Sequence, residues 1–308
     1  MRSDLHSTPP RTPLSPGAPV ARVTRSSRRD AGALAPVLVL LGLAVAAAAL
    51  LGPLGLGVIE YHVSGGATAQ VRGGDLVGLV LVAPTCVVAA WLVRRGHPGA
   101  PALAVAPAAY ALYTAAELAV AGDVRRYPGT SERWFPLLLV VLVLGGAALV
   151  LAGSRLAATA PTTMPLRRTT GWYMLVVAAF LALGLHLPGL LDAWRATPRS
   201  AEYLADPSPF WTVKVLDLGV VVPVLLVVGV GLLRDRPWAR VARAPVVAWC
   251  ALLGSAVAGM AVVMLGTGAA GASVGLTVGF VGAAALALAL AAAVFRPLLG
   301  QRTEEAVG

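Results

Sequence analysis

Charged side chains are scarce in this chain, and so are the residues that most soluble enzymes rely on. Only 12% of its 308 residues are charged, against roughly 25% in soluble domains. It contains no asparagine and a single lysine, Lys214, beside 23 arginines. Its two cysteines, Cys86 and Cys250, fall inside apolar runs, where a thiol behaves as a small apolar group. Neither a disulfide framework nor a cysteine metal site is therefore supported.

Long apolar runs are abundant instead. The chain is 58% hydrophobic, with a mean hydropathy of +0.80, and runs of about 20 apolar residues are long enough to cross a bilayer as helices. We therefore predict an all-α polytopic transmembrane bundle of about eight spans. The predicted spans cover residues 33–59, 76–93, 101–121, 135–153, 172–194, 210–238, 245–265 and 274–295.

The net charge of +10 is carried by arginines in short segments between these runs. With both termini placed in the cytoplasm, inside segments hold seventeen arginines and outside segments hold six, which agrees with the positive-inside rule. No folded domain is left to present a basic face to nucleic acid, so we expect none to bind. The expected partner is the lipid bilayer, and the expected location is the plasma membrane.

The two ends of the chain differ from the apolar region between them. Residues 1–31 are rich in Pro, Ser, Thr and Arg and are expected to be a disordered cytoplasmic tail. A basic segment before an apolar one also describes a signal peptide, but this run is too long for a normal h-region, which favours an uncleaved span. Residues 32–296 then form the transmembrane domain, and residues 297–308 form a short cytoplasmic tail.

The second and sixth spans resemble each other, which suggests a tandem repeat of four plus four helices. Asp75 and Asp217 lie near their starts, Pro84 and Pro223 lie near their middles, and arginines close both. Such a repeat would relate the two halves by an axis along the membrane normal.

Ionisable and aromatic residues inside the spans gather in the outer halves of the helices. A charge within a bilayer costs about 3 kcal/mol on insertion scales, so such residues are candidates for function. They predict a polar pocket open to the outside above an apolar inner layer. The candidate ligand-binding residues are Asp217, Lys214, Glu117, His186, Asp75 and Tyr113.

Structural roles compete with ligand binding for several of these residues. Lys214 and Asp217 are spaced i, i+3 on one helix face and can neutralise each other, and Lys214 can also snorkel to the outer interface. Tyr113 and Glu117 could line a cavity or bond neighbouring helices. A lone histidine such as His186 is most often a packing residue.

Motifs for cofactors and metals fail on inspection. Residues 266–271 match G-x-G-x-x-G, but they join two predicted spans and follow no strand. A single histidine with distant carboxylates does not make a metal site, and Lys214 is not deep enough in a last span for a retinal Schiff base. The sequence thus predicts no cofactor and no metal.

Four motifs resemble those of a group of uncharacterised multi-pass membrane proteins of actinobacteria and related bacteria. The motifs are QVRGGD at 70–75, YALY at 110–113, LDLG at 216–219 and RDRPW at 234–238. The resemblance covers about residues 58–265 and departs from the group at Gly74 and at Ala239, where a glycine is expected. It implies about eight helices and an outer site, and it implies no reaction.

Three functions remain open at this point. The first is a membrane protein whose outward pocket binds or transports a small solute or ion. The second is a membrane-embedded enzyme acting on lipid or an envelope precursor, with Asp75, Asp217 and His186 as acid-base or metal groups. The third is a structural or accessory subunit. Catalytic residues and protein partners stay unknown.

Overall fold

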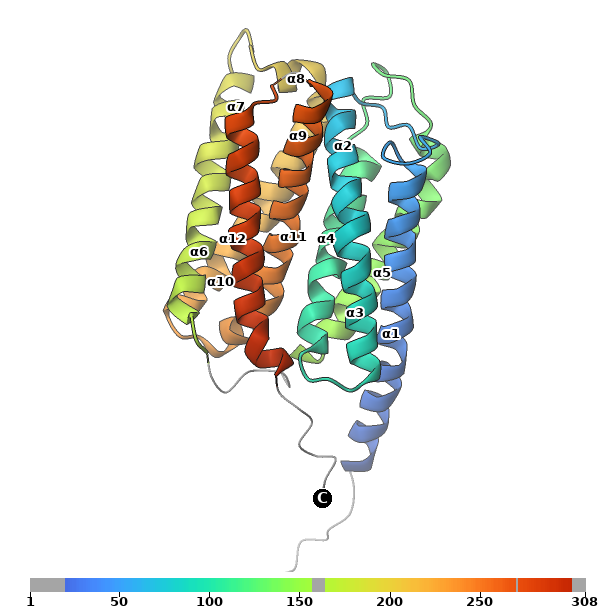
Figure 1. Ribbon diagram of the computed structural model, residues 1–308, viewed down its shortest axis with the longest axis vertical. Helices are drawn as coiled ribbons and strands as arrows, with labels where there is room; N and C mark the ends of the chain where they lie inside the picture. Colours follow the sequence, from blue (N-terminus) through green and yellow to red (C-terminus); the bar gives the residue numbers. More distant parts are fainter. Residues whose placement is uncertain (1–19, 157–163, 270, 301–308) are drawn as a thin grey trace, which may run out of the picture.

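The computed structural model describes residues 20–156, 164–269 and 271–300, and within that part the chain is helical. Eight helical spans are long and apolar enough to cross a membrane, in agreement with the predicted bundle. They run side by side, with the long connecting segments at one end and the beginning of the first helix and the end of the last at the other (Figure 1). We call these the loop end and the terminal end.

Several spans are built from more than one helical element. The elements are α1 (Val20–Leu51), α2 (Gly65–Val77), η1 (Gly78–Val82), α3 (Ala83–Arg94), α4 (Ala100–Val120), η2 (Ser131–Trp134), α5 (Phe135–Gly153), α6 (Arg167–Ala179), η4 (Phe180–His186), α7 (Leu187–Ala193), α8 (Ala201–Ala205), α9 (Pro207–Leu216), η5 (Asp217–Val221), α10 (Val222–Leu233), α11 (Pro237–Thr267) and α12 (Val274–Leu299).

Three spans contain a π-helical segment, and each segment ends two residues before a proline. The segments η1, η4 and η5 precede Pro84, Pro188 and Pro223. Proline has no N–H, and its ring clashes with the carbonyl four residues earlier. In all three spans the residue just before the proline donates its N–H to the carbonyl five residues back. The widened turn moves the carbonyl away from the ring and keeps the helix continuous.

The helix α11 is the centre of the packing. It lies against α2, α4, α10 and α12, while α1, α3, α4 and α5 form a second packed group. Small residues allow the close approach between α2 and α11, since a Cβ on Gly73 would lie 2.3 Å from the backbone of Met260. Glycines at helix contacts are typical of membrane bundles, in which backbones approach closely.

The first two spans differ from their predicted limits. The predicted span 33–59 ends at Leu51, because Pro53 interrupts the helical hydrogen bonds there. The glycine-rich segment before Asp75 was predicted to be a loop, but it forms α2, whose N-cap Ser64 accepts a hydrogen bond from the N–H of Ala67. Asp75 therefore lies about 15 Å along a helix from Gly65 instead of at the outer surface.

The remaining spans lie close to their predicted limits, and α11 begins earlier, at Pro237. The helix α1 begins at Val20 and α12 continues to Leu299, so each overlaps a predicted tail. Residues 1–19 and 301–308 of those tails lie outside the described residues. In each half the first two spans pack together, and so do the last two; the repeat and the orientation of the termini stay predictions.

Candidate functional site

A cavity of about 850 Å³ extends from the loop end past the middle of the bundle. Its walls come from α2, α4, α6, α9, α11 and α12, together with η4 and η5, and most of them are apolar. Its size falls within the range of small-molecule sites, which are mainly apolar with a few polar groups. All six candidate residues of the sequence analysis line it.

Asp217 is the centre of a hydrogen-bonded group in this cavity. Its Oδ2 lies 2.7 Å from Nε2 of His186, and its Oδ1 accepts a hydrogen bond of 2.8 Å from the hydroxyl of Tyr113. The side chains of His186 and Asp217 are 4% and 13% exposed. Each of the three residues comes from a different span, so the group ties α4, η4 and η5 together. A buried carboxylate with two donors is well satisfied.

The π segments place two members of this group. η5 begins at Asp217 and η4 ends at His186. Each π turn contains one residue more than an α-helical turn. The extra residue rotates the side chains that precede the proline toward a different face of the helix. The prolines at 188 and 223 therefore determine how the two side chains meet.

Lys214 does not pair with Asp217, contrary to the i, i+3 prediction. Its Nζ lies 3.8 Å from Oε1 of Glu202 on α8 and 3.4 Å from the centre of the Phe210 ring. The lysine is buried, and an ammonium above an aromatic face is stabilised by the ring quadrupole. It reaches toward the loop end of the bundle, whereas Asp217 bonds to other helices.

Glu117 also lines the cavity, one turn from Tyr113 on α4. Within the described part of the chain, no hydrogen bond or ion pair to its carboxyl is recorded. The negative charge of Asp217 acts on the Glu117 carboxyl from a neighbouring span. Since His186 faces Asp217 and Lys214 faces Glu202, Glu117 has no counter-charge among the described residues.

Asp75 and Tyr61 add two buried polar atoms to the wall. Oδ2 of Asp75 and the hydroxyl of Tyr61 are inaccessible and have no hydrogen-bond partner. Both residues line the cavity. Burial raises the pKa of the Tyr61 hydroxyl, and the negative charge of Asp75 adds to the effect, so Tyr61 stays neutral.

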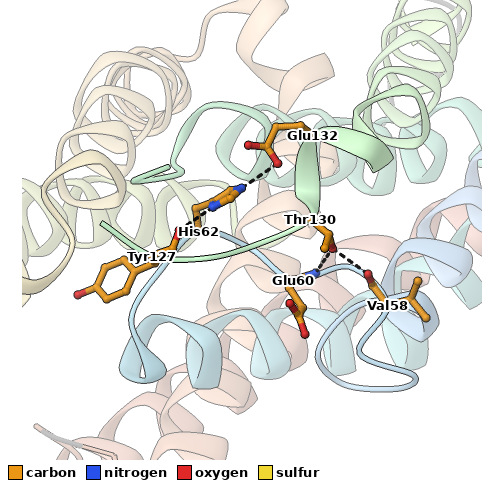
Figure 2. Close-up of polar contacts among 6 residues, drawn as sticks. All are labelled: Val58, Glu60, His62, Tyr127, Thr130 and Glu132. Atoms are coloured by element: carbon orange, nitrogen blue, oxygen red, sulfur yellow. Dashed lines mark hydrogen bonds and ion pairs between the residues drawn. The ribbon is translucent and has the colours of Figure 1, made fainter. Parts of the chain in front are cut away.

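Three connecting segments at the loop end are joined over the cavity by hydrogen bonds. Figure 2 shows His62, whose Nδ1 lies 2.7 Å from the carbonyl oxygen of Tyr127 and whose Nε2 lies 2.8 Å from Oε2 of Glu132. Thr130 accepts from the N–H of Glu60 and donates to the carbonyl oxygen of Val58. These contacts join residues 52–64 to residues 121–134.

The third segment, residues 194–206, is attached to the first two through Asp206 and Arg126. Asp206 accepts hydrogen bonds from the N–H and the hydroxyl of Ser64, and Arg126 donates to the carbonyl oxygens of Leu204 and Ala205. We call this set of three segments the cap. Asp206 and His62 are buried, so the cap is an ordered part of the structure.

The two ring nitrogens of His62 both face acceptors, a carbonyl and a carboxylate, and only an imidazolium can donate to both. The hydrogen bond to Glu132, followed by that to Tyr127, raises the pKa of His62 above its ordinary value. Sequence reasoning missed this pair, since no spacing rule connects residues 62 and 132. The sequence feature that could have indicated this contact is the mixture of acidic and basic residues at 123–133.

Among the described residues, no group of three or more His, Cys, Asp or Glu is arranged to hold a metal ion. Comparison with protein-family models, with curated proteins and with solved structures gives no match. The resemblance to actinobacterial membrane proteins therefore stays a prediction, and function has to be inferred from the cavity itself.

Proposed function

We propose that this integral membrane protein binds a small solute that carries both a cationic group and an apolar part, and moves it across the membrane. The observation that carries the proposal is that Glu117, an acidic side chain in a largely apolar cavity, has no hydrogen bond or ion pair to any residue that the structure describes. An amphipathic cation would place its charge beside Glu117 and its apolar part against the walls formed by α6 and α12.

The Asp217 group supports a role in recognition. The Tyr113 hydroxyl and the His186 ring hold the Asp217 carboxylate in a fixed position one helix away from Glu117. Held in this way, the Asp217 carboxylate is a fixed polar group beside the site, and Glu117 supplies the unpaired negative charge. A cavity of this kind selects cations over neutral or anionic molecules of equal size.

The proposal includes an orientation. The arginines of the terminal end support a cytoplasmic position for that end, which would make the cap face the outside of the plasma membrane. Both native cysteines are buried, so single cysteines placed at exposed positions report the topology. Ala196→Cys in the cap should react with an impermeant maleimide on intact cells, and Ser154→Cys at the other end should react after the membrane is opened.

Binding is tested with tetraalkylammonium ions of increasing chain length and with tetraphenylphosphonium, measured against purified protein and as uptake into proteoliposomes. A hydrogen bond or contact to a charged group is worth about 1.5–3 kcal/mol, so Glu117→Gln should weaken binding about 10-fold to 100-fold. The matched control is Glu60→Gln, whose side chain lies in the exposed part of the cap. Equal affinity of wild type and Glu117→Gln for every probe would refute the proposal.

A further inference from the structure

Asp75 has a buried carboxylate oxygen that no protein donor reaches. The residue is 8% exposed, and its Oδ2 is inaccessible and without a hydrogen-bond partner. A backbone hydrogen bond from Leu54 reaches the carboxyl, which leaves the second oxygen unsatisfied. A carboxylate accepts several hydrogen bonds, and leaving a buried charged acceptor unpaired is strongly unfavourable.

The orphan oxygen points at the last turn of α1, which presents more acceptors. A Cβ built on Gly52 would lie 2.8 Å from Oδ2 of Asp75, 2.9 Å from the carbonyl oxygen of Ala48 and 3.6 Å from that of Ala49. The three oxygens therefore lie within 3.6 Å of one position beside the Gly52 backbone, and the Ala48 carbonyl also accepts the N–H of Gly52. Residue 53, four positions after Ala49, is a proline, so the Ala49 carbonyl lacks its usual helical donor.

An ionised Asp75 is disfavoured beside these carbonyl oxygens. The carbonyls at a helix C-terminus carry the negative end of the helix dipole, which attracts cations and disfavours a carboxylate. Here a buried carboxylate faces such an end at close range. A positive charge placed between them would convert the repulsion into binding.

A small cavity of about 40 Å³ lies beside this point. It is lined by Ala48 and Ala49 of α1, Gly74 and Asp75 of α2, and Tyr110 of α4, among others. The Tyr110 hydroxyl donates to the carbonyl oxygen of Gly74, at 3.4 Å, and it also makes a hydrogen bond with Thr114. The space exceeds the roughly 10–15 Å³ that one water molecule needs. Its lining is mostly apolar, and the carboxylate and carbonyl oxygens next to it are the ligands that hard cations prefer.

Among the described residues, the side chain of Arg72 on α2 comes near this place, and it donates to the carbonyl oxygen of Pro53 just after α1. In the described ranges no ion pair to Asp75 is recorded, and the titratable groups that face it are two tyrosines, Tyr61 from the cap and Tyr110 from α4. The parts of α1, α5 and α11 around it contribute apolar side chains, such as Val45, Leu138 and Met260.

We propose that Asp75 and the terminal carbonyls of α1 form a binding site for one monovalent cation, either a sodium ion or a proton. Bound at Oδ2, the cation would bridge the carboxylate and the Ala48 and Ala49 carbonyls. The site stands on geometry that is independent of solute binding at Glu117. Because Asp75 lines both cavities, a cation bound there would also sit in the wall of the solute cavity.

The test is thermal unfolding of the purified full-length protein in detergent, with sodium chloride replaced by choline chloride at constant ionic strength and with pH varied from 6 to 9. A sodium site predicts a midpoint that rises by a few degrees and saturates with sodium. A proton site predicts a midpoint that is indifferent to sodium and rises as the pH falls. A wild-type midpoint that responds to neither would overturn the proposal.

Asp75→Asn isolates the site, because its amide donates to the α1 carbonyls in place of the cation. Asp75→Asn and Glu60→Gln are compared in a His62→Gln background, which removes the pH response of His62. There the Asp75→Asn variant should fold and lose the dependence on sodium or pH, while Glu60→Gln keeps it. If Asp75→Asn retains the wild-type response, the cation binds elsewhere and the proposal is wrong. Binding of radioactive sodium to the wild type, and the infrared band of a protonated carboxyl group, give readouts that need no variant. Uptake of organic cations tests Glu117 separately, so failure of one proposal does not imply failure of the other.

Discussion

The contact between Asp217 and His186 makes a quantitative prediction. Asp217→Ala removes the acceptor of two partly buried hydrogen bonds, of 2.7 Å and 2.8 Å, and leaves His186 and Tyr113 without this partner. Removing one partner of a buried pair typically costs about 3–5 kcal/mol, and we expect that loss in the free energy of unfolding. His186→Ala removes one donor of the two and should cost about 1.5–3 kcal/mol.

A double-mutant cycle separates the contact from these individual losses. With Asp217→Ala and His186→Ala combined, the second substitution has little left to remove, so we expect a coupling energy of about 1.5–3 kcal/mol. The assay is unfolding with sodium dodecyl sulfate in mixed micelles, followed by the fluorescence of the native tryptophans. Each unfolding midpoint should move in proportion to the expected loss.

The same cycle with Lys214→Met tests the pairing that the i, i+3 spacing suggested. Lys214 contacts Glu202 and Phe210, so its coupling to Asp217 should stay below about 1 kcal/mol. Additivity within about 0.5 kcal/mol between Asp217 and His186, together with strong coupling between Asp217 and Lys214, would refute the arrangement described above.

Two further predictions concern the cap and the packing of α2. The pKa of His62 is raised in the folded protein. Its contact with Glu132 therefore stabilises the fold fully below the pKa of the unfolded chain, about 6.5. This stabilisation is lost as the pH rises through the higher pKa of the folded protein. The difference in melting temperature between wild type and His62→Gln should therefore shrink as the pH rises, and a constant difference would contradict this. Gly73→Ala would place a Cβ 2.3 Å from the Met260 backbone and should cost about 3 kcal/mol or more. Gly279→Ala, which meets nothing within 4 Å, should leave stability unchanged or raise it, as measured by the same unfolding assay.

Hydropathy alone predicted the number of spans, because each must be about 20 residues long and apolar whatever its neighbours are. It located α5 at its observed limits, Phe135–Gly153, since that helix is uniformly apolar. It failed at α2, where glycines and polar residues look like a loop. Gly73 is required by the close contact with α11, and a contact between distant segments leaves no periodic trace in the sequence.

The sequence predicted which residues belong to the candidate site, but it did not predict how they are arranged. Intramembrane charge pointed to Asp217, Glu117 and His186, since such charges are costly anywhere in a bilayer. Their partners could not be predicted, because the contact between Asp217 and His186 depends on two π turns whose effect on side-chain direction is invisible in residue spacing. The His62 contact to Glu132 joins residues 70 positions apart, beyond the reach of local rules.

The π turns before Pro84, Pro188 and Pro223 also have a mechanical consequence. Each holds one residue in excess of the α-helical register, and one residue corresponds to a rotation of about 100° around the helix axis. If the excess residue of η5 were deleted, the loop-end part of that span would turn by this angle while the part beyond Pro223 kept its packing. Asp217 would then leave His186 and face a different neighbour. The spans that carry the site are thus joined to the rest of the bundle by points of twist, at which a change of one residue reorients half a helix.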